Sequence, residues 1–158
     1  MTDSTQTVKP SERLAQLGLE LPAVAKPLAA YVPAVQVGNQ IWTSGQLPMR
    51  GGKALHLGKV GAAVTPEQGA DCAQQCALNA LAAAASVAGG IDQIKRIVKL
   101  VVFVASDPAF TGQPAVANGA SELMGEIFGE AGAHVRSAFG VAVLPLDVPV
   151  EMELVVEI

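Results

Sequence analysis

The sequence has few residues that bind metals or form disulfides, with two cysteines and two histidines among 158 residues. Cys72 and Cys76 are four residues apart in a predicted helix, and no second cysteine pair completes a zinc site. We interpret both as small buried residues. His56 and His134 are distant in the sequence and form no metal-ligand pattern. No metal or cofactor is therefore expected.

Charged residues are also scarce. They make up 15% of the chain, the net charge is −4, and the ten Lys and Arg residues form no basic run. Proteins that bind a nucleic-acid backbone carry clustered cations, so nucleic acid is not the expected partner. Hydrophobic residues reach 51%, yet no apolar run approaches the roughly 20 residues that span a bilayer. The polar start, Met1–Thr7, lacks the features of a secretion signal, which predicts a cytoplasmic protein with no membrane partner.

The length predicts one domain with a single core. Residues 1–27 are interpreted as an N-terminal extension, in which Ser11–Leu17 is a short helix that ends at Gly18. Residues 28–158 are expected to form the domain itself.

A β-hairpin is predicted near the start of this domain. Residues 31–37 and 40–46 alternate with a period of two, and Gly38-Asn39 supplies the turn. Pro33 cannot donate to a strand ladder, so we expect the first strand at a sheet edge or at a bulge. The glycine-rich loop Arg50–Lys53 lacks the phosphate-binding pattern and is interpreted as a surface turn.

Two helices and three further strands complete the pattern. Thr65 is a capping residue, with Pro66 at the first helical position and Gln68 three residues after the cap, and this helix should end before Gly89. The remaining predicted elements are a strand at 97–104, a helix at 114–130, a strand at 136–143 and a last strand from residue 150. Two strand-helix-strand units put both helices on one face of a mixed sheet. The other face is apolar and uncovered, which predicts self-association.

Arg136 is the most informative cation. Its strand turns at Leu144–Asp147 and returns through the acidic segment Val150–Leu154, which should bring the arginine beside the acidic strand. A guanidinium group binds a carboxylate through two parallel hydrogen bonds, which lysine cannot do. The carboxylate could belong to the protein, in a salt bridge at the sheet edge, or to a ligand.

Four separated segments of residues 28–158 resemble the RidA/YjgF family of reactive-intermediate deaminases, also called the endoribonuclease L-PSP family. They occur in the family's order at nearly the family's spacing. The segments are Tyr31–Val35, Trp42–Pro48, Asn118 at the opening of the second helix, and Arg136-Ser137 followed by Leu144-Pro145 and Val150–Glu153. The extension and the approach Phe128–His134 resemble a longer subgroup of this family.

The resemblance implies a chorismate-mutase-like α+β fold, assembled as a homotrimer whose sheets form a central barrel with ligand clefts between subunits. It also implies hydrolysis of enamines and imines, such as 2-aminoacrylate, to 2-keto acids and ammonia without metal or cofactor. In this chemistry Arg136 would hold the substrate carboxylate and Glu151 would position or activate water. The residues implied to line the cleft are Tyr31, Ser44, Gly45, Asn118 and Ala138. Many members have cysteine where this chain has Ala138, so a backbone contact is the role left for that position.

Two other functions stay open. A non-catalytic module that binds small carboxylates, or a chaperone-like protective module, would use the same cleft and need Arg136 but not Glu151. A ribonuclease or translation inhibitor is the third alternative, and the acidic composition weighs against it.

Imine hydrolysis itself makes modest demands on a site. Imines already react with water, so the site only needs to hold the carboxylate, place a water molecule and shield the intermediate.

Overall fold

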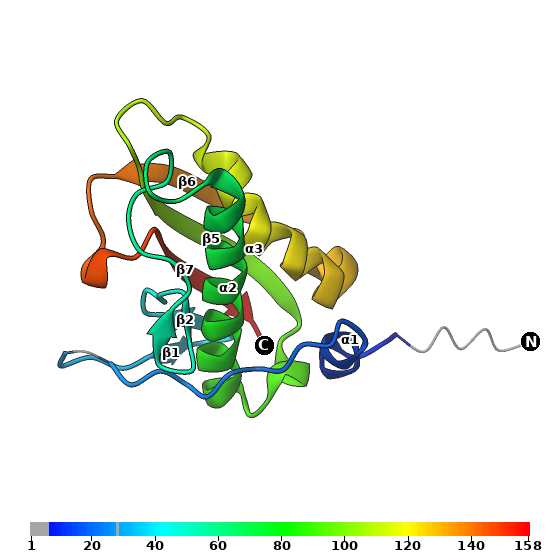
Figure 1. The fold of residues 1–158 in the computed structure, drawn as a ribbon. Helices are drawn as coiled ribbons and strands as arrows, with labels where there is room; N and C mark the ends of the chain where they lie inside the picture. The colour runs from blue at the N-terminus through cyan, green and yellow to red at the C-terminus, as the bar shows by residue number, and fades with distance from the viewer. Residues whose placement is uncertain (1–6, 28) are drawn as a thin grey trace, which may run out of the picture.

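The computed structural model describes residues 7–27 and 29–158, which form one mixed sheet packed against helices (Figure 1). The sheet order is β1-β2-β7-β5-β6. Its strands are β1 (Ala34–Val37), β2 (Gln40–Thr43), β5 (Arg96–Ala105), β6 (Val135–Val141) and β7 (Val150–Glu157), with helices α1 (Pro10–Gln16), α2 (Pro66–Ala88) and α3 (Gln113–Phe128). This is the α+β fold that the resemblance implies.

Helix α2 begins and ends where the sequence predicts. The Thr65 hydroxyl accepts a hydrogen bond from the Gln68 N–H at 3.1 Å, and the Gln68 side chain accepts one from the Thr65 N–H at 3.0 Å. Gly89 ends the helix in the left-handed conformation, with φ of 89°. This reciprocal cap satisfies two N–H groups that have no partner inside the helix.

Small residues let α2 and α3 pack closely. A methyl group on Gly119 of α3 would lie less than 3.0 Å from the backbone carbonyl of Ala70 on α2. Much of α2 is alanine, and the run Ala82–Ala85 is buried. The position of α3 relative to the sheet therefore depends on the absence of a side chain at residue 119.

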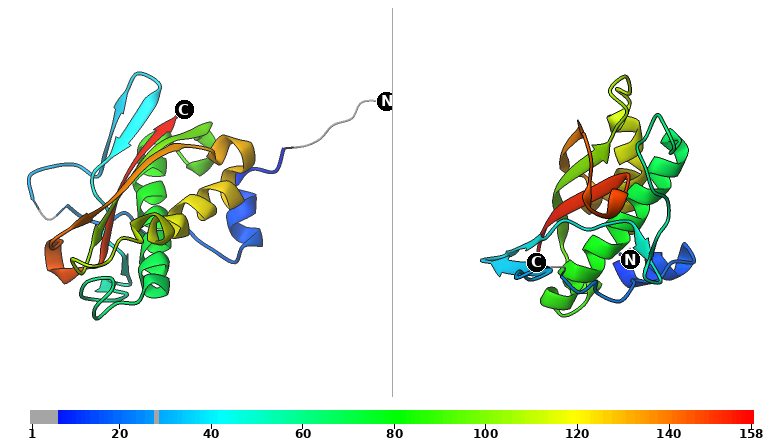
Figure 2. Two further views of the ribbon diagram at one scale, coloured as in Figure 1. Left: turned by 90° about the horizontal axis from the view of Figure 1, so that it is seen from above. Right: turned by 60° about the vertical axis from the view of Figure 1, so that its left-hand side comes forward.

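Both long helices cover one face of the sheet, as predicted (Figure 2). We call this the helix face; it carries the buried side chains of Leu100, Val102 and Leu154. The open face carries Phe103 and Trp42, whose side chain is 50% exposed. In the part of the chain that the structure describes, no helix or strand covers the open face.

One detail of the predicted hairpin region is wrong. Strand β1 starts at Ala34 instead of residue 31, because Pro33 has no N–H to donate, although β1 does lie at the sheet edge.

The predicted surface turn at Arg50–Lys53 is present, and it joins a small hairpin, β3 (Met49–Arg50) and β4 (Lys53–Ala54). Its turn is Gly51-Gly52, and both residues have positive φ, 58° and 80°.

The prediction that Arg136 lies beside the acidic last strand is also wrong. Strand β5 separates β6 from β7, because the β5-α3-β6 crossover makes β6 a parallel edge strand. Strand β7 pairs antiparallel with the other side of β5 and with β2. A pattern of strand, turn and strand does not establish that the two strands are neighbours.

Helix α1 is attached to the rest of the domain through Asp92. The Ser11 N–H and hydroxyl of α1 both donate to the Asp92 carboxylate, at 2.9 and 2.7 Å.

Cys72 and Cys76 are buried, as predicted. Burial, followed by the charge of Asp71, raises the pKa of Cys72 to about 11. Its thiol is therefore protonated and unreactive. Among the described helices none is long and apolar enough to cross a membrane.

Candidate functional site

Arg136 and Asn118 lie together, as the resemblance implies. Arg136 is in edge strand β6, and its side chain reaches across to α3. Its Nη1 donates to Asn118 Oδ1 at 2.8 Å and to Ser121 Oγ at 3.0 Å, while Nη2 donates to the Pro114 carbonyl at 3.3 Å. Asn118 lies within α3, not at its opening, since the helix begins at Gln113. The long α3 therefore holds the arginine from three points.

All three partners of Arg136 are neutral. Within the described residues, its hydrogen bonds therefore do not include the protein carboxylate that the salt-bridge alternative requires. A guanidinium group has five N–H donors. Both Nη1 hydrogens and one Nη2 hydrogen are engaged, which leaves Nε–H and one Nη2–H. The positive charge and two donors thus remain for another group.

Glu151 lies in a different environment, on β7. It is half-buried on the open face, where it pairs across the strands with Phe103. Burial, followed by the charge of Glu153, raises the pKa of the Glu151 carboxyl above its ordinary value. A carboxyl group with a raised pKa exchanges protons more readily near neutral pH than an ordinary glutamate does.

Gly45 makes room for this carboxylate. A methyl group at position 45 would lie less than 3.0 Å from Oε1 and Cδ of Glu151. The chain leaves strand β2 after Thr43 and returns to β7 at Gln46, whose backbone N–H and carbonyl both bond to Met152. The irregular Ser44-Gly45 step between them is where the carboxylate packs.

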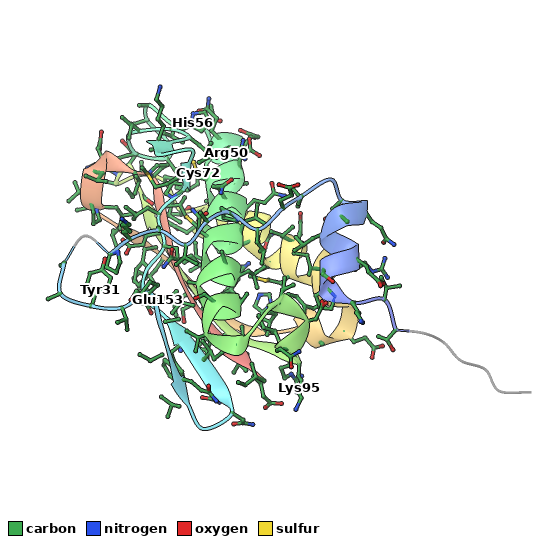
Figure 3. The ribbon with its side chains drawn as sticks, turned by 90° about the horizontal axis from the view of Figure 1, so that it is seen from below. Tyr31, Arg50, His56, Cys72, Lys95 and Glu153 are labelled. Carbon is green, nitrogen blue, oxygen red and sulfur yellow. The ribbon has the colours of Figure 1, made fainter. Side chains whose placement is uncertain are left out.

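Ser44 connects this step to the segment that precedes β1. Its N–H donates to the Pro33 carbonyl at 2.8 Å and its hydroxyl donates to the Val32 carbonyl. Tyr31 comes directly before this segment and is 49% exposed; Figure 3 labels it on the loop that leads into β1. The two hydrogen bonds of Ser44 hold the segment before β1 against the Ser44-Gly45 step.

Arg136 and Glu151 occupy opposite faces of the same sheet. Arg136 pairs with Leu100, which pairs with Leu154, and both leucines are buried on the helix face. Glu151 instead pairs with Phe103 on the open face. Alternate residues of a strand point to opposite faces, so the two charged side chains point away from each other. The single chain therefore presents the two charged groups on different faces of the sheet.

Ala138 belongs with Arg136. It pairs with Val102 on the helix face, and its side chain packs against the core. The predicted residues thus form two groups. One contains Arg136, Asn118 and Ala138, and the other contains Tyr31, Ser44, Gly45 and Glu151.

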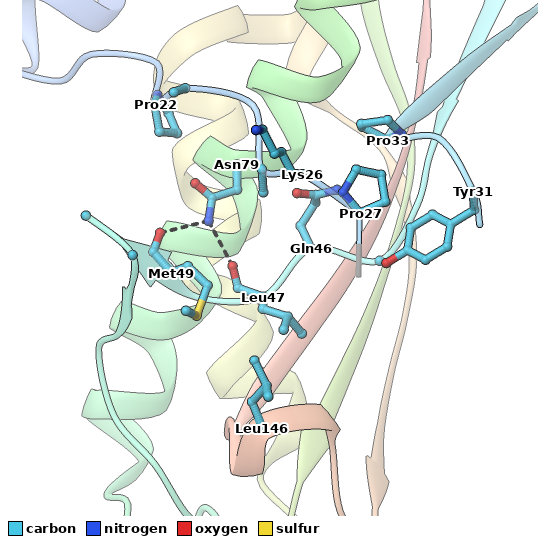
Figure 4. A pocket seen from close by; sticks show the side chains of 15 residues that line it. Pro22, Lys26, Pro27, Tyr31, Pro33, Gln46, Leu47, Met49, Asn79 and Leu146 are labelled. Carbon is cyan, nitrogen blue, oxygen red and sulfur yellow. Dashed lines mark hydrogen bonds between the residues drawn. The ribbon is translucent and has the colours of Figure 1, made fainter. Parts of the chain in front are cut away.

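A cavity of about 560 Å³ adjoins the second group (Figure 4). Tyr31 and Gly45 line it, and most of the other lining side chains are apolar. They include Pro22, Ala23, Ala25 and Pro27 from the N-terminal segment and Leu47 and Met49 from the opposite wall. Lys26 is the charged residue of the lining, and its side chain is exposed.

Buried amides support the floor of this cavity. Asn79 Nδ2 donates to the carbonyls of Leu47 and Met49, at 2.8 and 3.0 Å, and Gln75 donates to Asn79 Oδ1 at 3.1 Å. Sequence analysis did not select these residues. The signal was present, because Gln75 and Asn79 are two polar residues four apart in an alanine-rich helix.

These observations define an α+β protein with helices on one sheet face and an arginine held by α3 at the sheet edge. A family model described as "YjgF/chorismate mutase-like, putative endoribonuclease" matches residues 11–158. The chain belongs to this family, as the resemblance indicated, and the matched range includes much of the predicted extension.

Known proteins match this chain over most of its length. Protein TCP17 of Trypanosoma cruzi is 44% identical over 146 residues, which cover 92% of this chain and 91% of that protein. A Shewanella oneidensis structure, with the same endoribonuclease description, is 38% identical with a TM-score of 0.92, covering 96% of this chain and all of that one. Escherichia coli TdcF, solved with bound serine, is 26% identical with a TM-score of 0.57, covering 85% and 93%.

Proposed function

We propose that the protein hydrolyses 2-imino and 2-enamino carboxylic acids to 2-keto acids and ammonia, at sites shared between two subunits of a homotrimer. The observation that carries this proposal is the placement of Arg136 and Glu151 on opposite sheet faces. A ring of identical subunits can set the arginine group of one against the glutamate group of the next. Exposed apolar side chains on the open face, among them Trp42 and Phe139, supply a surface for that assembly.

The arginine group suits a substrate carboxylate. Its two free donors, on Nε and Nη2, are available for charge-assisted hydrogen bonds to a carboxylate. Neutral partners hold the group without neutralising it. The serine bound to TdcF is a small molecule with a carboxylate, which supports this assignment.

The glutamate group suits the addition of water. Glu151 would take a proton from water as the oxygen attacks the imine carbon and the C=N double bond becomes a C–N single bond. The same carboxyl group would return this proton to nitrogen, which gives a carbinolamine with one hydroxyl and one amino group. It would then move the hydroxyl proton to the amino nitrogen as the C–N bond breaks and the C=O bond forms, so that ammonia leaves. An enamine must first gain a proton at carbon and lose one from nitrogen to become the imine. The raised pKa of the Glu151 carboxyl group suits it both to accept a proton from water and to return a proton to nitrogen.

The cavity would accept the side chain of the substrate. Its volume lies within the range of small-molecule sites, about 300–1,000 Å³. Because the N-terminal segment forms one wall, the predicted extension would take part in selecting the substrate. The endoribonuclease description is not favoured, since a net charge of −4 gives little attraction for a phosphate backbone.

Mixed trimers provide a direct test. The wild type should release ammonia and keto acid from freshly generated amino-acid imines, and Arg136→Ala and Glu151→Gln should each be inactive. Refolding the two variants together should restore activity, because a neighbour of the right kind completes some sites. Random assembly predicts about a quarter of the wild-type sites. No activity from mixed trimers of the two folded variants would contradict the shared site, and no turnover by the wild type would contradict the proposed function.

A further inference from the structure

A second set of polar residues surrounds Arg136 and takes no part in the proposed chemistry. His134 lies just before β6, and Ser121 lies on α3. His134 Nδ1 is 2.6 Å from the Gly132 carbonyl oxygen, and its Nε2 is 2.9 Å from Ser121 Oγ. Ser121 Oγ also accepts the hydrogen bond from Arg136 Nη1 at 3.0 Å. The four groups thus form one continuous chain.

Donor and acceptor chemistry gives this chain a direction. A carbonyl oxygen only accepts, so His134 Nδ1 must carry a hydrogen. In neutral imidazole, Nε2 is then the acceptor, and the Ser121 hydroxyl must donate its single hydrogen to it. The lone pairs of Ser121 are left for Arg136. The hydrogen bond to Gly132 therefore determines, through the His134 tautomer, that the Ser121 hydrogen points to Nε2 and away from the guanidinium.

We infer that Ser121 and His134 are positioning residues for Arg136, an inference that rests on the proposed function. Asn118 and Pro114 hold the guanidinium from the same helix, and Ser121 adds a third point whose direction is locked. A small-molecule site requires its binding groups in one geometry, held by partners that are themselves held. Neutral partners also leave the arginine charge to the ligand, whereas a carboxylate partner would compete with it.

A purely structural role is the alternative, since the same bonds connect α3 to the start of β6. The two roles differ in what a substitution changes. A positioning role predicts that removal of the Ser121 hydroxyl weakens carboxylate binding only while Arg136 is present. A structural role predicts the same loss of thermal stability in either background and no special effect on the carboxylate.

The test combines binding, turnover and the histidine tautomer. Ser121→Ala should raise the Kd for a small 2-keto acid, and the KM for imines, by roughly tenfold. Ser121→Thr, which keeps the hydroxyl, should restore both values, and Ser86→Ala, a helix serine bonded only to the Ala83 carbonyl, is the matched control. In an Arg136→Ala background, which is expected to be inactive, only the Kd is compared, and Ser121→Ala should not raise it further. Equal losses in the two backgrounds would overturn the inference.

Nitrogen NMR of His134 supplies a readout that needs no substrate. The wild type should show the hydrogen on Nδ1, the tautomer that the Gly132 contact requires, and a hydrogen on Nε2 in the neutral ring would overturn the inference. The 2-keto acid measurement also separates this inference from the proposed function. If the wild type binds the keto acid but turns over no imine, the proposed hydrolysis fails, while the Kd values still test the roles of Ser121 and His134.

Discussion

The carboxylate of Glu151 packs directly against the backbone of Gly45. An added methyl group at position 45 would lie less than 3.0 Å from Oε1 of that carboxylate. The glycine is therefore required by a neighbouring functional group and not by its own backbone angles, because its φ is not in the left-handed region. This makes residue 45 a sensitive probe of where the carboxylate must lie.

Gly45→Ala should displace the Glu151 carboxylate and lower imine turnover by at least about tenfold, with the fold retained. Overpacking of this kind usually costs about 1–3 kcal/mol of stability. Gly125→Ala is the matched control: it lies in α3 with nothing within 4 Å of the added methyl, so it should keep full activity. It should even gain roughly 0.5–1 kcal/mol of helix stability. Steady-state kinetics and thermal unfolding measure both effects, and unchanged turnover by Gly45→Ala would contradict the assigned position.

Glu151→Gln should make the protein more stable at neutral pH while it removes turnover. The folded protein holds a proton on Glu151 more tightly than the unfolded chain does, because burial and then Glu153 raise its pKa. The stability that this proton contributes is therefore complete below the ordinary pKa of 4.5 and is lost as pH rises through the folded pKa. Glutamine cannot ionise and avoids that loss.

The expected observation is a Tm difference in favour of Glu151→Gln at pH 7 that shrinks to nothing below pH 4.5. Glu126→Gln, at an exposed position on α3, is the control and should show no such trend. A Tm difference that is the same at every pH would show that ionisation of Glu151 is not its source.

Arg136→Lys should keep the charge and lose most of the activity. A lysine ammonium is a single point of charge and cannot reproduce the simultaneous bonds to Asn118, Ser121 and a ligand carboxylate. A charge-assisted hydrogen bond is worth about 1.5–3 kcal/mol, which corresponds to roughly ten- to a hundredfold in kcat/KM. Near-wild-type turnover by a well-folded Arg136→Lys protein would remove the central assignment.

Ala25→Trp should select against large substrates. Ala25 lines the cavity from the N-terminal segment, and an indole there would occupy space proposed for the substrate side chain. Turnover of a leucine-derived imine should fall roughly tenfold or more, while that of an alanine-derived imine should change little. Val24→Trp is the paired control, because the adjacent Val24 is exposed and is not among the residues that line the cavity. If Ala25→Trp and Val24→Trp change the turnover of the two imines equally, the cavity does not determine which substrate is used.

The sequence predicted those features that depend on local chemistry. The cap at Thr65 and the stop at Gly89 follow from hydrogen bonds within a few residues, and both lie where they were expected. The closeness of Arg136 and Asn118 came from a family resemblance. In contrast, the separation of β6 and β7 by β5 depends on long-range pairing, which hydrophobic periodicity does not determine. Because the sequence did not predict that register, it also did not predict that Arg136 and Glu151 lie on opposite faces of the sheet.

The missed residues share a second reason. Ser121 and His134 are ordinary polar residues when taken singly, and their contact exists only because α3 packs across the start of β6. The same holds for the N-terminal segment, which reaches the cavity wall only after the chain has folded around α2. Sequence reasoning identified Arg136, Glu151 and Asn118, and it left out the residues around them that only the fold brings close.

The alternation of side chains along β6 and β7 has a consequence for the newly made protein. A newly folded single chain would hold Arg136 and Glu151 on opposite faces of its sheet, so it would have no activity however well it folded. Catalysis would then begin only when chains meet, and at low abundance the active fraction would rise more steeply than the amount of protein synthesised. Under the proposed function, a cell would therefore switch this activity on by accumulation of the protein, with no separate signal.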